Sequence, residues 1–311
     1  MTNLSEFTFL SSDGKTQLHG MLWEPEGVAV RAVLQICHGV AEHIARYDGF
    51  ARALNEQGIV VAGHDHLGHG KSLPEGGTPV YFGDGNTWNT VVDDIYVLHQ
   101  RLKQRYPDVP LCIMGHSMGS FLTRTYLIRY PGTVKAAVIM GTGWQPQAAI
   151  TGGLANAIAA VSGENATSEL VTELAFGSYN KLFAPNRTKV DWLSADESNV
   201  DDYIADPLCG ADATVGLFRQ MLHGIRFNQR QSHLRQMDRE IPMLFVAGDK
   251  DPVGSCGKGV RQTYDAFRAA GMRDCTLKLY PGLRHEILNE KAYTADITKN
   301  IEAWLLSRLE K

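Results

Sequence analysis

The pentapeptide Gly115-His116-Ser117-Met118-Gly119 restricts the fold of this chain more than any other feature. It follows residues 111–114, a short apolar run typical of a buried strand. It precedes residues 120–130, where apolar side chains recur at helical spacing until a Pro-Gly pair ends the pattern. A serine in a G-x-S-x-G turn between a strand and a helix must adopt a strained backbone conformation. The glycines lack a Cβ and let neighbouring segments approach the turn. We therefore expect the Ser117 hydroxyl at the strand end, above the helix N-terminus.

The rest of the chain alternates between apolar strands and helical segments. This alternation favours a mostly parallel central sheet with helices on both faces. The sequence thereby resembles the α/β-hydrolase fold, which implies that Ser117 is the nucleophile. Strands are expected at residues 6–10, 18–23, 32–37, 59–62, 111–114, 134–140, 241–247 and 276–280, and helices at 46–57, 86–106, 120–130, 257–270 and 293–309.

The alternation stops after residue 140 and resumes at residue 241. Between these points no strong strand pattern occurs, and the segment has a helical composition rich in small and apolar residues. We expect a first part of the α/β-hydrolase core at 1–143, an inserted helical cap at 144–237 and a second part of the core at 238–311. Such a cap would cover the carboxyl ends of the strands, where open α/β sheets bind ligands.

Composition limits the partners and the location of the chain. Its net charge is −4, and no basic run indicates nucleic acid as a partner. The first ten residues lack the basic start and apolar region of a signal peptide, and no apolar run is long enough to span a membrane. The five cysteines lack C-x-x-C spacing, which predicts reduced thiols in the cytoplasm. The oligomeric state is left open.

The acid and the base that serve Ser117 are sought by their order along the chain. In α/β-hydrolases an Asp or Glu follows the serine, and a histidine follows the acid. Of the eleven histidines, only His285 lies in the second half of the predicted sheet. The acid should follow the strand that ends at residue 247, which leaves Asp249 and Asp251. Pro252 fixes a turn that can aim the preceding side chain inward, so Asp251 is favoured as the acid and Asp249 as a turn carboxylate.

These residues fit nucleophilic catalysis of acyl transfer. His285 would take the proton of the weakly nucleophilic Ser117, and Asp251 would hold the imidazole tautomer. The oxyanion of the tetrahedral intermediate needs two N–H donors. Met118, directly after the serine, would supply one, and Val40, behind the third predicted strand, would supply the other.

Two further motifs narrow the resemblance. Residues 38–43, H-G-V-A-E-H, with Arg46 and Tyr47, resemble the H-G-x-x-E-H…R-Y signature of the monoglyceride lipase and lysophospholipase branch. Residues 65–72 and the G-H-S-M-G pentapeptide are similar to that branch too. The resemblance implies a serine esterase that cleaves carboxylic esters with one long acyl chain, without a metal or cofactor.

The sequence assigns no role to three positions. His66 departs from the branch, which commonly has arginine there. Glu42 and His43 could support the catalytic residues, and a buried capping pair explains them equally well.

A different mechanism is hydrolysis by zinc. His64, His66 and His69 nearly reproduce the H-x-H-x-D-H signature of a dinuclear zinc site. Gly68 occupies the carboxylate position of that signature, so a required ligand is missing.

Other functions could use the same fold. A ligand-binding receptor would tolerate loss of the catalytic residues, all of which are present here. A proline-type aminopeptidase would need an acidic cap residue for the substrate ammonium, and Glu164, Glu169 and Glu173 could serve. An acyl thioesterase cannot be separated from an esterase by sequence.

The predicted cap contains two apolar segments, residues 148–161 and 217–222. Part of each segment should pack on the core. We expect the remaining face to line a tunnel from Ser117 for the acyl chain of a small-molecule ester. The segments are too short for stable insertion into a membrane, but they allow the cap a transient contact with a membrane surface.

Overall fold

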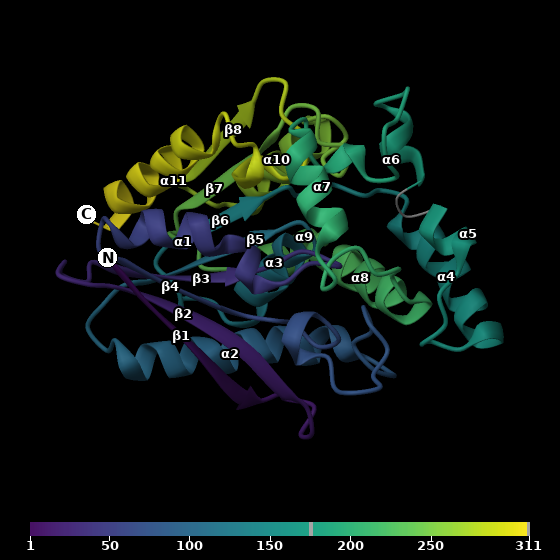
Figure 1. Cartoon of the computed structure of the whole chain (residues 1–311), viewed down its shortest axis with the longest axis horizontal. Coiled ribbons are helices and arrows are strands. Elements are labelled where there is room, and N and C mark those ends of the chain that lie inside the picture. Colours follow the sequence, from purple (N-terminus) through teal and green to yellow (C-terminus); the bar gives the residue numbers. More distant parts are fainter. Residues whose placement is uncertain (174–176, 310–311) are drawn as a thin grey trace.

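An eight-stranded sheet forms the centre of the protein (Figure 1). The computed structural model describes residues 1–173 and 177–309. The strands are β1 (Thr2–Leu10), β2 (Gln17–Pro25), β3 (Ala32–Cys37), β4 (Ile59–His64), β5 (Leu111–His116), β6 (Ala137–Met140), β7 (Met243–Gly248) and β8 (Cys275–Tyr280). Their order in the sheet is β1-β2-β4-β3-β5-β6-β7-β8. The β1–β2 and β2–β4 pairs are antiparallel and the others parallel, so the predicted mostly parallel sheet is confirmed.

Helices cover both faces of the sheet, as predicted. One face packs against α1 (Asp48–Asn55) and α11 (Thr294–Leu309), and the other against α2 (Thr87–Arg105), α3 (Met118–Arg129) and α10 (Lys258–Ala270). Successive side chains of a strand point to opposite faces. In β5, Leu111 and Ile113 therefore belong to the core under α2, α3 and α10, whereas Cys112 and Met114 belong to the core under α1 and α11.

The segment between β6 and β7 is largely helical, and most of it lies at the right of Figure 1. We call residues 144–237 the cap. Its helix α8 packs against α3 of the core and against α4. In its described residues, an isolated bridge between Thr167 and Thr214 is the only β pairing. The predicted domain boundaries stay predictions. The cap elements are α4 (Ala148–Ser162), α5 (Glu169–Thr172), α6 (Ser178–Lys181), the 3₁₀ helix η4 (Asp191–Leu193), α7 (Glu197–Ala205), α8 (Val215–Asn228) and α9 (Gln231–Leu234).

Two element predictions need correction. The helix expected at 46–57 is a 3₁₀ helix, η1 (Ile44–Tyr47), followed by α1. The strand expected at 134–140 begins at Ala137, because its pairing with β5 and β7 starts there. Val134 is buried in the core without belonging to the sheet, so its apolar character indicates packing and not a strand.

The sheet topology brings the predicted site residues to the same edge of the sheet. Parallel strands direct their carboxyl ends to the same edge of a sheet. The loops after β3, β5, β7 and β8 carry Val40, Ser117, Asp251 and His285.

None of the described helices combines the length and the apolar character that a membrane span requires.

Candidate active site

Ser117 lies in a sharp turn between β5 and α3. Its backbone has φ 55° and ψ −122°, a conformation that L-residues rarely adopt. A Cβ on Gly115 would lie 2.3 Å from the carbonyl oxygen of Gly119, and a Cβ on Gly119 would lie 2.0 Å from the carbonyl oxygen of Cys37. Only glycine fits at both positions, so the strained serine turn depends on the two glycines of the pentapeptide.

His38 orients the backbone of the predicted oxyanion donor Val40. Its Nδ1–H donates to the carbonyl oxygen of Gly39 (2.7 Å), and its Nε2 accepts from the backbone N–H of His66 (3.0 Å). These bonds need the neutral imidazole, and burial lowers the pKa of His38 accordingly. The carbonyl of Gly39 and the N–H of Val40 belong to one planar peptide, so fixing the carbonyl also fixes the donor.

Among the described residues, neither predicted oxyanion donor has a hydrogen-bond acceptor. Met118 is the first residue of α3, so its N–H has no acceptor within the helix. Across the described residues, no hydrogen bond uses the N–H of Val40 or of Met118. Both residues line a cavity together with Ser117.

The structure places His285 against Asp251. The Nδ1–H of His285 donates to Oδ1 of Asp251 (3.0 Å), and both side chains are buried. The same oxygen accepts the backbone N–H of Val253 (2.9 Å), which fixes the carboxylate. Asp249 instead accepts the N–H of Gly282 (2.8 Å) and has the turn position that the sequence predicted for it.

Ser117 and His285 line the same cavity. In the described structure no hydrogen bond joins the serine hydroxyl to the imidazole. Catalytic hydrogen bonds of this kind often tighten only when substrate binds.

Two cavities meet at Ser117. The larger, about 510 Å³, we call the charged cavity, because Glu173, Lys181, Lys189 and Asp212 contribute to its lining. The smaller, about 370 Å³, we call the uncharged cavity, because none of the described residues that line it is charged. Its apolar walls include Phe121, Leu182, Phe218, Met221, Leu222 and Val253.

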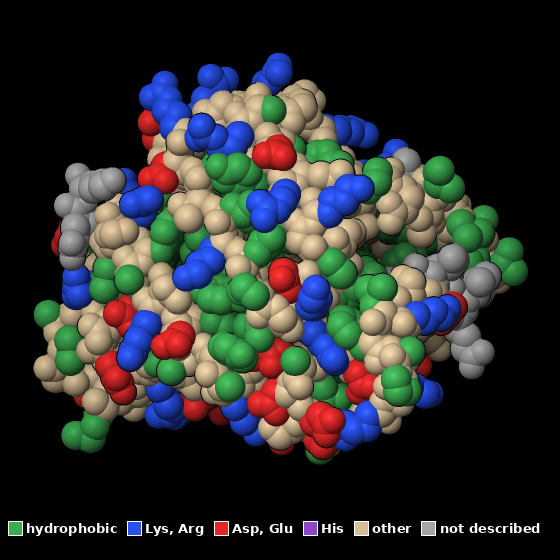
Figure 2. All heavy atoms as spheres, turned by 90° about the horizontal axis from the view of Figure 1, so that it is seen from above, with side chains coloured by type: hydrophobic (Ala, Val, Ile, Leu, Met, Phe, Trp, Pro, Cys, Tyr) green, Lys and Arg blue, Asp and Glu red, His purple; other side chains and the backbone are tan. Residues whose placement is uncertain are grey.

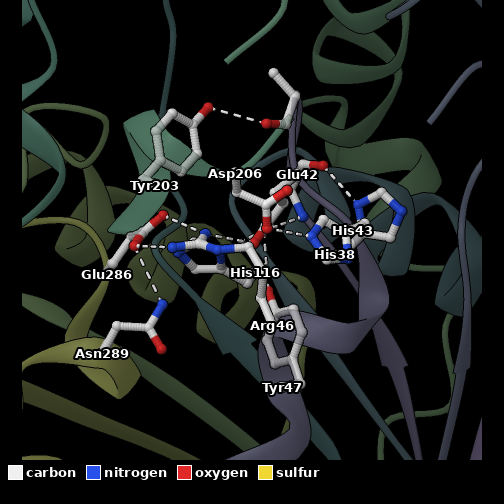
Figure 3. A network of polar contacts seen from close by, with 12 residues as sticks. His38, Glu42, His43, Arg46, Tyr47, His116, Tyr203, Asp206, Glu286 and Asn289 are labelled. Atoms are coloured by element: carbon white, nitrogen blue, oxygen red, sulfur yellow. Dashed lines mark hydrogen bonds and ion pairs between the residues drawn. The ribbon is translucent and has the colours of Figure 1, made fainter. Parts of the chain in front are cut away.

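A buried ion network lies beside the charged cavity (Figure 3). Arg46 donates two hydrogen bonds to Glu286 (both 2.7 Å) and one to Glu42 (2.9 Å). Asn199 of the cap helix α7 donates to the same Glu286 (2.9 Å). Burial disfavours the charged form of Glu286, but Arg46 outweighs burial and lowers the pKa of this carboxyl. Because Glu286 directly follows His285, the network connects the cap with the loop of the proposed base.

His116 links Glu42 to the loop that carries His285. Its Nδ1–H donates to Oε1 of Glu42 (3.2 Å) and its Nε2–H to the carbonyl oxygen of His285 (3.3 Å). Both partners can only accept hydrogen bonds, so both ring nitrogens of His116 must donate. Only the imidazolium form carries a proton on both nitrogens. Burial lowers the pKa of His116, but the bond to Glu42 and its charge outweigh burial and raise this pKa. Glu42, a residue without an assigned role in the sequence, is therefore a buried partner of His116.

The histidines of the zinc alternative do not form a metal site. His64, His66 and His69 are buried, and burial lowers the pKa of each, to about 3 for His64 and His69. Within the described residues, one group of three side chains brings possible ligand atoms within 4.8 Å of one another, and it consists of His43, Asp206 and Cys209.

His43 and Asp206 join the cap to the core. The imidazole of His43 and the carboxylate of Asp206 form a 2.8 Å hydrogen bond between the loop after β3 and the cap. This pairing accounts for His43 without a metal.

Two of the three carboxylates of the aminopeptidase alternative already have partners. Glu173 lines the charged cavity and pairs with Lys181 (2.6 Å), whereas Glu164 pairs with Arg219 (2.6 Å) and does not line that cavity. The side chain of Glu169 lies outside the described residues.

The sequence pattern assigned no role to five residues around this site. Arg46 and Tyr47 were noted only as part of a motif, and His116 only as part of the pentapeptide. Glu286 could have been found because it directly follows the proposed base. Nothing local in the sequence indicates Trp192, which lines both cavities.

The fold and the strained serine turn define an α/β-hydrolase. A family model described as serine aminopeptidase, S33, matches residues 28–292, and the chain belongs to that family of hydrolases. Two curated relatives are similar over nearly their whole length. The monoacylglycerol lipase of Mycolicibacterium smegmatis is 31% identical over 310 residues, which cover 98% of each chain. The human monoglyceride lipase is 28% identical over 305 residues, which cover 96% of this chain and 89% of the relative.

A solved structure agrees with these relatives. A thermostable carboxyl esterase from Bacillus coagulans superposes with a TM-score of 0.92 at 27% identity, covering 99% of this chain and 100% of the esterase. The predicted fold and the resemblance to the monoglyceride lipase branch are thereby confirmed.

Proposed function

We propose that this protein is a serine hydrolase that cleaves carboxylic esters carrying a single acyl chain, of the monoacylglycerol or lysophospholipid type. The observation that carries the proposal is the position of Ser117, where an uncharged and a charged cavity meet. An ester has an apolar acyl side and a polar alcohol side, and the two cavities match these sides. The relatives named as monoacylglycerol lipases support a lipid ester as substrate.

The proposed reaction uses Ser117, His285 and Asp251 as a catalytic triad. His285 takes the serine proton while the serine oxygen attacks the acyl carbon. The N–H groups of Val40 and Met118 stabilise the oxyanion of the tetrahedral intermediate. His285 then protonates the leaving alcohol, an acyl-enzyme forms on Ser117, and water, activated by the same histidine, releases the fatty acid. No step requires a metal or cofactor.

The acyl chain would occupy the uncharged cavity. Each buried CH₂ group contributes about 0.8 kcal/mol, so longer chains gain binding energy until the cavity is full. The alcohol would occupy the charged cavity, where Lys189 could also meet the phosphate of a lysophospholipid. Thioesters remain an alternative substrate class, because a thiol leaving group makes the same demands on the triad. An aminopeptidase is less well supported, since Glu173 already pairs with Lys181.

The cap would contact a lipid surface transiently. Helix α4 contains no charged residue, and its Ile150 and Val161 are 82% and 90% exposed. Hydrophobic side chains gather at the right-hand end of Figure 2, where Figure 1 places α4. Such a surface would let the enzyme take its substrate from a membrane. We also infer a cytoplasmic location from the five cysteines, all of which are free thiols.

The proposal is tested with a substrate panel and a covalent probe. The panel contains p-nitrophenyl esters, monoacylglycerols, lysophospholipids and aminoacyl amides, and single-chain esters should be the best substrates. A fluorophosphonate should label the wild type, and Ser117→Ala should abolish labelling and turnover, a loss on the order of a millionfold in kcat. Near wild-type turnover in Ser117→Ala, or a preference for aminoacyl amides, would contradict the proposal.

A further inference from the structure

Trp192 lies at the junction of the two cavities. In the described part of the chain, the residues that line both cavities are Val40, Ser117 and Trp192. Val40 and Ser117 belong to the proposed reaction centre, so Trp192 is the one member of this set that comes from the cap. Its side chain is therefore a wall between the place proposed for the acyl chain and the place proposed for the alcohol.

The indole ring packs directly over the proposed base. Its centroid lies 5.1 Å from that of the His285 ring, with 41° between the ring planes. The ring of Tyr179 packs edge-on against Trp192 at 5.2 Å. Trp192 is only 9% exposed, although it faces both cavities. These contacts hold the wide indole ring in one place beside the reacting carbon.

Hydrogen bonds fasten the Trp192 segment to the loop of the base. Arg284 donates to two backbone carbonyls of residues 191–194, and the N–H of Glu286 donates to a third carbonyl (2.7 Å). The carboxylate of Glu290 accepts the N–H groups of residues 195–196 (2.8 and 3.1 Å). Five hydrogen bonds thus join the segment that carries Trp192 to the segment that carries His285. These bonds fix the position of Trp192 relative to His285.

We propose that Trp192 is a specificity-determining residue that separates the acyl chain from the alcohol and excludes esters with two acyl chains. This inference rests on the proposed esterase function and adds a residue that selects esters with one acyl chain over esters with two. In a diacylglycerol the glycerol carries a second chain into the alcohol position. That chain would enter the charged cavity, because the Trp192 ring blocks its way back into the uncharged cavity. Apolar groups lose affinity where they displace water from charged side chains without replacing its hydrogen bonds.

Removal of the ring should merge the two cavities beside Ser117. In Trp192→Ala the second chain of a diacylglycerol can bend past the glycerol into the uncharged cavity. Loss of the ring contact to His285 will change turnover of all substrates alike. The ratio of kcat/KM for a monoacylglycerol to that for a 1,2-diacylglycerol with the same acyl chain cancels this common effect. We expect this ratio to be at least about tenfold lower in Trp192→Ala than in the wild type.

The experiment measures this ratio in detergent micelles of fixed composition for the wild type, Trp192→Ala and Trp192→Phe. Trp192→Phe retains a ring and should keep most of the selectivity. Phe218→Ala is the matched control, because it removes a buried aromatic side chain from the uncharged cavity away from the junction. It should change the preferred chain length but leave the ratio within about threefold of the wild type. If Trp192→Ala does not fold, as judged by thermal unfolding, Trp192→Leu provides the same comparison.

The outcomes distinguish this inference from the proposed function. A wild type that cleaves monoacylglycerols and diacylglycerols equally well overturns the role of Trp192 and leaves the esterase proposal intact. An unchanged ratio in folded Trp192→Ala or Trp192→Leu does the same, as does an equal drop in Phe218→Ala. A wild type without activity on any acyl ester overturns the proposed function itself.

Discussion

The contact between Asp251 and His285 gives a quantitative prediction. We consider Asp251→Asn, which removes the charge of the carboxylate and keeps its shape. Oδ1 of Asp251 accepts from His285 and from the N–H of Val253, whereas Oδ2 is buried without a partner among the described residues. The N–H of Val253 should therefore hold the amide oxygen of the asparagine at the Oδ1 position. The NH₂ group of the asparagine then lies at the Oδ2 position. His285 can still donate its Nδ1–H to the amide oxygen, so it keeps its catalytic tautomer.

The remaining effect of Asp251→Asn is the loss of one charge beside the imidazolium. The Nδ1–Oδ1 distance is 3.0 Å, which puts the centres of the delocalised charges about 4 Å apart. Two unit charges at about 4 Å attract by about 4 kcal/mol at an effective dielectric constant of about 20. At about 1.4 kcal/mol per tenfold change in rate, kcat should fall about a thousandfold. Where the same substitution enforces the wrong tautomer, the loss is about ten-thousandfold.

The assay is steady-state hydrolysis of a p-nitrophenyl ester at a pH where the wild type is fully active. Asp249→Asn is the control, since Asp249 contacts the backbone of Gly282 and not His285. Its kcat should stay within about threefold of the wild type. An Asp251→Asn enzyme within about tenfold of the wild type, or a larger loss in Asp249→Asn, would refute the assignment of the acid.

Three further predictions concern the cavity, the buried histidines and the cap surface. In wild type, kcat/KM should rise about three- to fourfold per acyl carbon until the uncharged cavity is full, and Met221→Trp should move this maximum to shorter chains in a p-nitrophenyl ester series. His64 has a pKa of about 3 in the folded protein against 6.5 in the unfolded chain, so the unfolded state binds more protons below pH 6.5 and stability falls as pH falls through this range. Between pH 7.5 and 5.5, the free energy of unfolding measured in urea should therefore fall by about 1.4 kcal/mol less in His64→Leu than in the wild type. An equal fall in both proteins would contradict the shifted pKa. Ile150→Glu with Val161→Glu should weaken sedimentation with phosphatidylcholine vesicles severalfold, whereas Ile204→Glu on the cap helix α7 should not, and equal weakening would exclude α4 as the contact.

Sequence alone was sufficient for the features that depend on local pattern and chain order. The serine turn could be predicted because a strand, two glycines and a helix must follow one another within a few residues around Ser117. His285 could be selected as the candidate base because chain order leaves no other histidine in the second half of the sheet. The helical segment between β6 and β7 could be anticipated because the alternation of strands and helices stops and resumes. Each of these inferences uses only the local pattern of residues or their order along the chain.

The tertiary structure decided what depends on contacts between distant segments. Asp249 and Asp251 are two residues apart, and only the fold shows that one meets Gly282 and the other His285. Arg46 pairs with Glu286 across 240 positions, which no local pattern reports.

Trp192 is the clearest case of such a contact. In the sequence it is one aromatic residue of a helical segment, and in the structure it borders both cavities and packs on His285. The physical reason is that helical and strand periodicity specify which face of an element is buried. The partner of that face is set by the packing of the whole chain.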